Sequence, residues 1–138
     1  MVGFPGETQE DFEKLCNFVE SAKFDKLGAF AYSKEEGTPA AKLKEQVHPM
    51  TKKARYNKIM EIQQKVSDEN LNKYIGKQLE VLVEGKTIDG KYYVCRSYMD
   101  VPDIDGLIYL NNSKELKIGD FVKCTIKSSI NEYDLLGE

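Results

Sequence analysis

The hydrophobic positions near the start of the chain repeat with the period of a helix. Four of them fall at intervals of three and four residues: Phe12, Leu15, Cys16 and Val19. This spacing predicts an amphipathic helix over residues 9–22. Thr8, followed three residues later by Asp11, is a variant of the capping box that begins helices. The next apolar run, residues 26–33, is short and bounded by charges, which is typical of a buried parallel strand.

A long loop and a long helix follow. Residues 34–49 contain one glycine and two prolines, so they are predicted to form a loop. Between residues 51 and 74 there is no Gly or Pro, and the apolar positions keep helical spacing within a charged surround. We therefore predict one helix over residues 51–74.

At Gly76 the period of the apolar positions changes from about 3.6 residues to about 2. The β-rich runs that follow, each closed by turn residues, are residues 77–85, 91–98, 106–110, 120–130 and 132–138. Their length and spacing predict a small antiparallel β-barrel. The chain is therefore expected to be an α+β protein with a helical first half and a barrel in its second half.

Composition and charge narrow the function classes. The chain has 138 residues, of which 41% are hydrophobic and 31% charged, so it is predicted to be globular. No stretch approaches the roughly 18 consecutive apolar residues of a membrane span, and we expect a cytoplasmic protein with no membrane partner. Residues 1–75 carry 12 Lys or Arg and 12 Asp or Glu, whereas residues 76–138 carry 8 and 11. The net charge of −3 therefore belongs to the predicted barrel.

The cysteines and the single histidine indicate no catalytic or metal site. Cys16, Cys95 and Cys124 are odd in number and far apart, so we interpret them as reduced core thiols. His48 lies in the predicted loop and is interpreted as a solvated linker residue. We expect neither catalytic nor metal-ligating residues in the chain.

Longer motifs carry a resemblance to a known family. The chain closely resembles the C-terminal portion of the radical-SAM methylthiotransferases, in particular the RimO-like branch that modifies a ribosomal protein. The matching stretches are residues 2–12, 24–41, 95–110 and 131–138, and the most specific are "CRSYMDVPDIDG" and "EYDLLGE". The chain departs from the family pattern mildly, because Cys95 replaces a glycine and Val101 and Asp103 replace alanine and glutamate.

The resemblance implies a three-part parent enzyme. Such enzymes have an N-terminal cluster-binding domain, an open (β/α) barrel that splits S-adenosylmethionine, and a small OB-like barrel called TRAM. Residues 1–46 would be the last two strand-helix units of the catalytic barrel, residues 47–75 the connecting helix, and residues 76–138 the TRAM barrel. We accordingly expect "MVGFPGET" to be the end of a strand whose neighbours precede it, and the chain to be a C-terminal fragment.

The resemblance also implies cofactors for the parent enzyme, namely two 4Fe-4S clusters and S-adenosylmethionine. Cleavage of S-adenosylmethionine uses three thiolates from one short loop, usually Cys-x3-Cys-x2-Cys. The three cysteines of this chain are 79 and 29 residues apart, so such a loop is absent from it. We expect this chain alone to hold no cofactor and to be inactive.

The turn "GFPGET" has a functional and a structural interpretation. Strand ends at the C-terminal face of such a barrel hold substrate, and helix-start amides attract anions such as the carboxylate of S-adenosylmethionine. For the parent enzyme, the resemblance implies a cofactor-side role for Gly3, Pro5, Gly6, Glu7 and Tyr32. The glycines and the proline also suit a plain tight turn, and within this chain we expect a scaffolding role.

Two partner classes compete for the predicted barrel. TRAM barrels of tRNA-modifying relatives bind RNA, which requires a surface rich in Lys and Arg. The acidic surplus of residues 76–138 instead favours a basic protein, by resemblance the S-twelve-like ribosomal protein that the branch modifies on an aspartate. The residues expected to contact the partner are Arg96, Tyr98, Asp100, Asp103, Asp105, Tyr133 and Asp134. The arginine and the tyrosines could also stack on bases, so RNA stays open as a partner.

Two other interpretations remain open. The chain could come from a tRNA-modifying methylthiotransferase whose TRAM domain binds RNA, or it could be a stand-alone binding module. A stand-alone module would cover residues 26–33 on both faces, whereas a piece of a larger barrel would leave that strand exposed.

Overall fold

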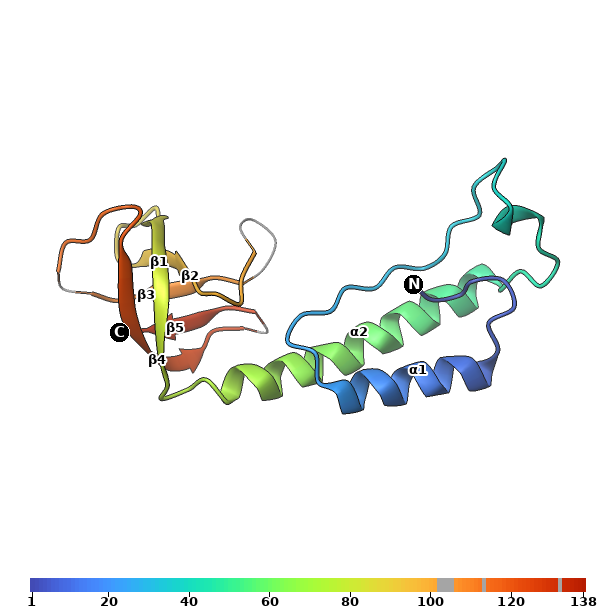
Figure 1. Cartoon of the computed structure of the whole chain (residues 1–138), viewed down its shortest axis with the longest axis horizontal. Helices are drawn as coiled ribbons and strands as arrows, with labels where there is room; N and C mark the ends of the chain where they lie inside the picture. Colours follow the sequence, from blue (N-terminus) through green and yellow to red (C-terminus); the bar gives the residue numbers. More distant parts are fainter. Residues whose placement is uncertain (102–105, 113, 132) are drawn as a thin grey trace. The chain divides into compact units, whose positions relative to one another are not determined.

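The computed structural model describes residues 1–101, 106–112, 114–131 and 133–138 (Figure 1). It divides into two compact units, residues 1–66 and residues 67–138. The long helix α2, Pro49–Asn72, contributes residues to both units. The predicted boundaries after residues 46 and 75 stay a prediction.

The first helix, α1, spans Gln9–Ala22, which confirms the predicted range. Its capping box is reciprocal: the Asp11 amide donates to Thr8 Oγ1 at 3.1 Å, and the Thr8 amide donates to Asp11 Oδ2 at 3.0 Å. Both bonds satisfy amides that have no partner inside a helix. On the apolar face, Phe12 and Val19 are buried.

The strand predicted over residues 26–33 is reduced to one isolated parallel bridge, between Val2 and Ala31. The Val2 amide donates to the Phe30 carbonyl at 3.0 Å, and the Tyr32 amide donates to the Val2 carbonyl at 2.8 Å. A ladder needs further bridges on either side of this one, and among the described residues the bridge between Val2 and Ala31 is isolated. Phe30 is 65% exposed, so the prediction of a buried strand is wrong in extent.

Helix α2 begins two residues before its predicted start, at Pro49, after a short 3-10 turn at Ala40–Lys42. Proline is tolerated at the first helical position because that amide would have no helical partner. His48 precedes it and acts as the cap: its carbonyl accepts from the Lys52 amide at 3.0 Å, and its Nδ1 accepts from the Met50 amide at 3.2 Å. His48 is exposed, as expected, but it orders the helix start.

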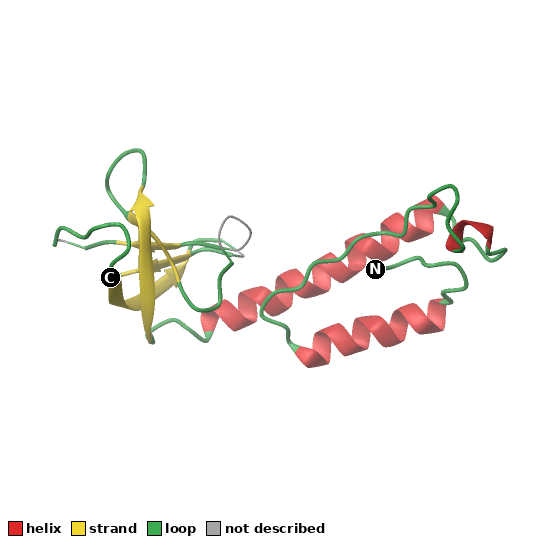
Figure 2. Ribbon diagram, turned by 45° about the horizontal axis from the view of Figure 1, so that its top comes forward, coloured by secondary structure: helices red, strands yellow, loops and turns green. Residues whose placement is uncertain are grey.

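The core of the first unit joins the two helices to the N-terminal segment. Val2, Phe12, Val19 and Ile59 form its buried cluster. Figure 2 shows α1 running beside the first part of α2. Packing of this kind, rather than helix propensity, supplies most of the stability of such helices.

The second unit contains the predicted barrel. Its strands are β1 (Gln78–Lys86), β2 (Tyr93–Arg96), β3 (Ile108–Leu110), β4 (Phe121–Ser129) and β5 (Leu135–Gly137). They close in the order β1-β2-β3-β5-β4. The β3–β5 pair is parallel and the other four pairs are antiparallel. The α+β class and the small, mainly antiparallel barrel are therefore confirmed.

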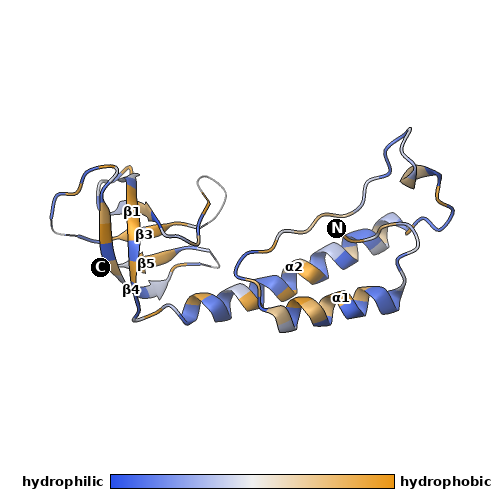
Figure 3. Ribbon diagram, in the orientation of Figure 1, coloured by the Kyte–Doolittle hydropathy of each residue, from blue (hydrophilic) through white to orange (hydrophobic). Residues whose placement is uncertain are grey.

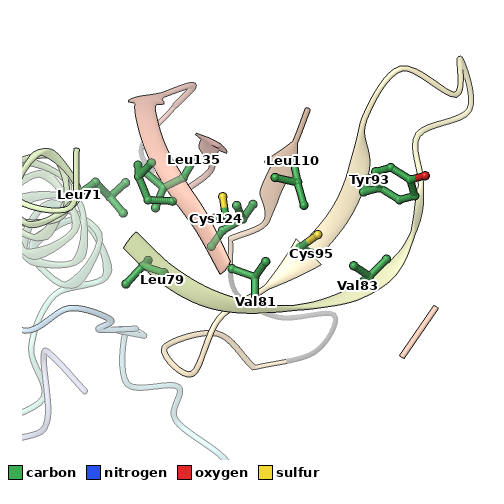
Figure 4. Packing of buried hydrophobic residues seen from close by; sticks show 11 residues of the cluster. Leu71, Leu79, Val81, Val83, Tyr93, Cys95, Leu110, Cys124 and Leu135 are labelled. Carbon is green, nitrogen blue, oxygen red and sulfur yellow. The ribbon is translucent and has the colours of Figure 1, made fainter. Parts of the chain in front are cut away.

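Alternate residues of each strand fill the barrel. Figure 4 shows side chains from β1, β2, β3, β4 and β5 converging with Leu71 on one interior, among them Val81, Cys95 and Leu135. The strands carry apolar stretches, whereas much of α2 is polar (Figure 3). Two glycines permit close approaches: a Cβ on Gly106 would lie 1.8 Å from the Tyr133 carbonyl oxygen, and one on Gly137 would lie 2.0 Å from Cys124 Sγ.

Candidate functional site

The turn at residues 3–8 is built around the Glu7 carboxylate. Gly3 and Gly6 both have positive φ, 73° and 90°, which favours glycine. The Gly3 amide donates to both carboxylate oxygens of Glu7, at 3.0 and 3.1 Å. The Gly6 amide donates to the Glu45 carbonyl at 2.8 Å. Pro5, between the glycines, is buried.

Arg55 of α2 holds this turn from the other side. Its Nη1 lies 2.6 Å from Glu7 Oε1 and also donates to the Glu7 carbonyl at 3.1 Å. The Arg55 and Glu7 side chains are only 8% and 14% exposed. The guanidinium carbon lies 5.4 Å from the centre of the Phe12 ring. One buried ion pair thus connects the turn, α1 and α2.

Tyr32 joins the same cluster through Lys52. Lys52 Nζ donates to the Tyr32 carbonyl at 3.0 Å and lies 5.3 Å from the centre of its ring. The Phe4 and Tyr32 rings meet edge to face at 5.4 Å. A Cβ on Gly3 would lie 2.3 Å from Lys52 Cγ, so only glycine leaves room for this lysine stem. The Tyr32 hydroxyl is buried and has no hydrogen-bond partner in the described part of the chain.

Four of the five residues expected on the cofactor side, Gly3, Gly6, Glu7 and Tyr32, therefore make structural contacts within this unit. The Gly3 amide donates to Glu7, and the capping box occupies donors at the start of α1. Lys52 and Arg55 are absent from the sequence-based prediction. Their spacing of three residues places them on one face of a helix, but exposed cations on surface helices have the same spacing.

The described residues among those expected to contact a partner come from several parts of the barrel. Arg96 on β2 forms a salt bridge with Glu84 on β1. Asp100 closes a turn, because Oδ2 accepts from the Ser97 amide at 2.9 Å and from its hydroxyl at 2.8 Å. Tyr98, close by in the chain, is 80% exposed. Asp103 and Asp105 lie outside the described residues.

The remaining two residues expected to contact a partner, Tyr133 and Asp134, lie near the start of β5. Asp134 Oδ1 accepts from the Leu107 amide at 2.8 Å, and Oδ2 accepts from Asn131 Nδ2 at 2.8 Å. This carboxylate therefore fixes the turn between β4 and β5 beside the start of β3. Tyr133 is 50% exposed.

The cysteines do not fit an iron-sulfur cluster. Cys16 is on α1, whereas Cys95 on β2 and Cys124 on β4 are buried inside the barrel. Burial raises the pKa of the Cys95 thiol to about 12, the nearby Cys124 adding to the effect, and burial also raises the pKa of Cys124. A metal needs thiolates that share one site, and these thiols are held protonated on separate elements. Among the described residues, no group of three His, Cys, Asp or Glu side chains could hold a metal ion.

No helix in the described part of the chain combines the length and the apolar character that crossing a membrane requires.

Comparisons with known proteins identify both parts of the chain. Residues 75–138 match the TRAM domain family. A relative from Alkaliphilus oremlandii, "Ribosomal protein uS12 methylthiotransferase RimO", is 57% identical over 139 residues, which is 100% of this chain and 32% of that relative. Relatives of the same name from Lachnoclostridium phytofermentans and Thermotoga maritima are 46% and 47% identical over 99% of this chain and 31% of their own length. The chain spans about a third of the length of the curated relatives it matches. It therefore corresponds to the C-terminal part of the RimO family of methylthiotransferases and carries a TRAM domain.

Proposed function

We propose that this chain is the substrate-recognition part of an enzyme that adds a methylthio group to an aspartate of the small-subunit ribosomal protein uS12. The carrying observation is the 57% identity, along the whole chain, with a relative named for that activity. In the parent enzyme, two 4Fe-4S clusters and S-adenosylmethionine would supply the radical chemistry. We propose that it acts in the cytoplasm, where ribosomal proteins are made and assembled.

The recognition surface that we propose is the acidic exterior of the TRAM barrel. Residues 76–138 hold 11 Asp or Glu against 8 Lys or Arg. Opposite charge on the partner would speed encounter and exclude polyanions. The exposed Tyr98 and Tyr133 rings offer further contact area. A barrel with this charge is suited to a basic protein rather than to RNA.

The test is a titration of the 138-residue chain with purified uS12 at several salt concentrations. The barrel variant combines Asp100→Asn, Asp103→Asn and Asp105→Asn, and it should bind uS12 more weakly than wild type. The affinity of wild type should fall with added salt, since the Debye length shrinks from about 30 Å at 0.01 M to about 8 Å at 0.15 M. The matched control removes three charges from α1 (Glu10→Gln, Glu13→Gln and Glu20→Gln) and should bind like wild type.

Three results would count against this function. These are equal affinity of the barrel variant and the wild type, an equal loss in the α1 control, and tighter wild-type binding to a structured RNA than to uS12. The last result would favour a tRNA-modifying relative. Unfolding curves are measured for every variant, because Asp100 accepts two hydrogen bonds from Ser97 and a loss of fold would itself weaken binding.

We also propose that this chain alone is catalytically silent, and that the turn at residues 3–8 faces S-adenosylmethionine only in the parent enzyme. The separation of Cys16, Cys95 and Cys124 on three elements supports this. After anaerobic reconstitution, the chain should retain no more than trace iron and release no 5′-deoxyadenosine. Stoichiometric loading with four irons would overturn the proposal.

A further inference from the structure

The outer face of the TRAM barrel differs from one side to the other. Between β1 and β4 it carries both a charged pair, Glu80 opposite Lys123, and an apolar pair, Leu82 opposite Phe121. On the other side, Val94 of β2 pairs with Tyr109 of β3, and Tyr109 pairs with Leu136 of β5. Three apolar side chains thus form a continuous row across three strands.

This row is not part of the barrel core. Side chains alternate between the two faces of a strand, and the neighbours of the row, such as Cys95, Ile108 and Leu135, are the ones buried inside. The outer face of a small barrel is ordinarily polar, and a contiguous apolar patch there marks an interaction surface. Val94, Tyr109 and Leu136 are each partly exposed.

The row is the floor of an open groove of about 1020 Å³. One wall is the loop between β1 and β2, which contributes Thr87, Ile88 and Tyr92, and the other is the turn between β4 and β5, which contributes Ile130 and Asn131. Ile88 is fully exposed and Ile130 is 53% exposed, so both rims present aliphatic side chains to an incoming partner.

Both walls also carry negative charge. Asp89 belongs to the wall formed by the loop between β1 and β2, and Asp134 belongs to the wall formed by the turn between β4 and β5. A hydrogen bond from Thr87 holds the pKa of Asp89 below its usual range, so this carboxyl stays ionised. Lys86 is the cation among the described lining residues, and its Nζ lies 4.7 Å from the centre of the Tyr93 ring. An RNA backbone would need the opposite balance of charge.

We propose that this groove docks a protein segment that carries an aliphatic or aromatic side chain flanked by Lys or Arg. The apolar side chain covers Val94, Tyr109 and Leu136, and the flanking cations approach Asp89 and Asp134. The inference rests on the proposed function, because it assigns the contact surface for the basic protein substrate. It adds that apolar burial, and not charge alone, holds the substrate.

The test uses the rim, where substitutions leave the core intact. Ile88→Thr with Ile130→Thr keeps the β-branched shape and removes apolar surface from both walls. The matched control is Ile118→Thr with Phe121→Thr, since these side chains are 77% and 68% exposed and lie outside the groove. The probes are purified uS12, a synthetic peptide of Lys and Leu, the same peptide with Ser for Leu, and a structured RNA.

We expect the groove variant to raise the Kd for uS12 at least tenfold, equivalent to about 1.4 kcal/mol, and the control to change it less than twofold. The Lys–Leu peptide should bind wild type, and the Ser version should not. If uS12 binds the groove variant and wild type equally, the inference fails while the proposed function stands. If uS12 does not bind wild type but the Lys–Leu peptide binds only through the groove, the inference stands and the proposed substrate fails. Groove-dependent RNA binding, or self-association abolished by the groove variant, would overturn the inference.

Discussion

Gly137 offers a sharp test of how the barrel closes. It lies in β5, between Leu110 of β3 and Ile126 of β4, and it is buried. A methyl group at this position would lie 2.0 Å from Cys124 Sγ, 3.4 Å from the Thr125 carbonyl oxygen and 3.8 Å from Cys124 Cβ. The first distance is a severe overlap and the other two are ordinary contacts. The clash of Gly137→Ala is therefore with one sulfur atom.

The size of the effect follows from this geometry. Overpacking a core costs about 1–3 kcal/mol, and an overlap of this depth places Gly137→Ala near 2–3 kcal/mol. Cys124→Ala removes one buried heavy atom and should cost about 1 kcal/mol. In the double variant the new methyl group occupies the space of the sulfur, so the total should stay near 1 kcal/mol. The coupling energy is then about −2 to −3 kcal/mol, within the range for residues in contact.

The assay is urea and thermal unfolding of wild type, both single variants and the double variant. Gly137→Ala should lower Tm by about 10–20 °C, and adding Cys124→Ala should restore most of it, since 1 kcal/mol shifts Tm by about 4–8 °C for a domain of this size. Gly85→Ala is the control, because a Cβ at this glycine of β1 would have nothing within 4 Å. If the two single effects simply add, or if Gly137→Ala is harmless, the packing described for β4 and β5 is wrong.

Three further outcomes are expected. Arg55→Met should destabilise the first unit by about 3 kcal/mol, because it leaves the buried Glu7 carboxylate without its cation. Adding Glu7→Gln should recover part of this loss in urea unfolding. An unchanged urea midpoint for Arg55→Met would contradict the buried pair. Hydrogen bonds from Thr8 hold the pKa of Asp11 below its usual range, so they stabilise the fold above the ordinary carboxyl pKa, and this stabilisation is lost as the pH falls. Thr8→Ala should therefore raise the Asp11 pKa in an NMR titration. A constant pKa would refute the capping box. Because burial raises the Cys95 pKa to about 12, the folded barrel keeps the thiol proton that the unfolded chain loses near pH 8.5. The contribution of Cys95 to the free energy of unfolding should therefore be fully present below about pH 8.5 and should decrease as the pH rises toward 12. In urea unfolding, Cys95→Ala should lose less stability at alkaline pH than wild type. The same loss in both proteins would exclude Cys95 as its source.

The local elements could be predicted from the sequence because their causes are local. Helix α1 follows from the spacing of its four apolar residues and from Thr8 and Asp11 at its start, and all six lie within one short segment. The five strands follow from alternation and turn residues, and their closure into a barrel agrees with the short, evenly spaced runs. The start of α2 was less accessible, because Pro49 is compatible both with a loop and with a first helical turn.

Contacts between distant segments were decided by the tertiary structure. Glu7 meets Arg55 across 48 positions of sequence, and nothing in either local pattern distinguishes them from exposed charged residues. The run at residues 26–33 has the composition of a strand but forms one bridge, because a ladder depends on its partner rather than on itself. Val94, Tyr109 and Leu136 come from three separate strands, and only their register places them in one apolar row. The periodicity of the sequence indicates which residues share a face of one element. Which faces meet depends on how the elements pair, and the groove forms only through that pairing.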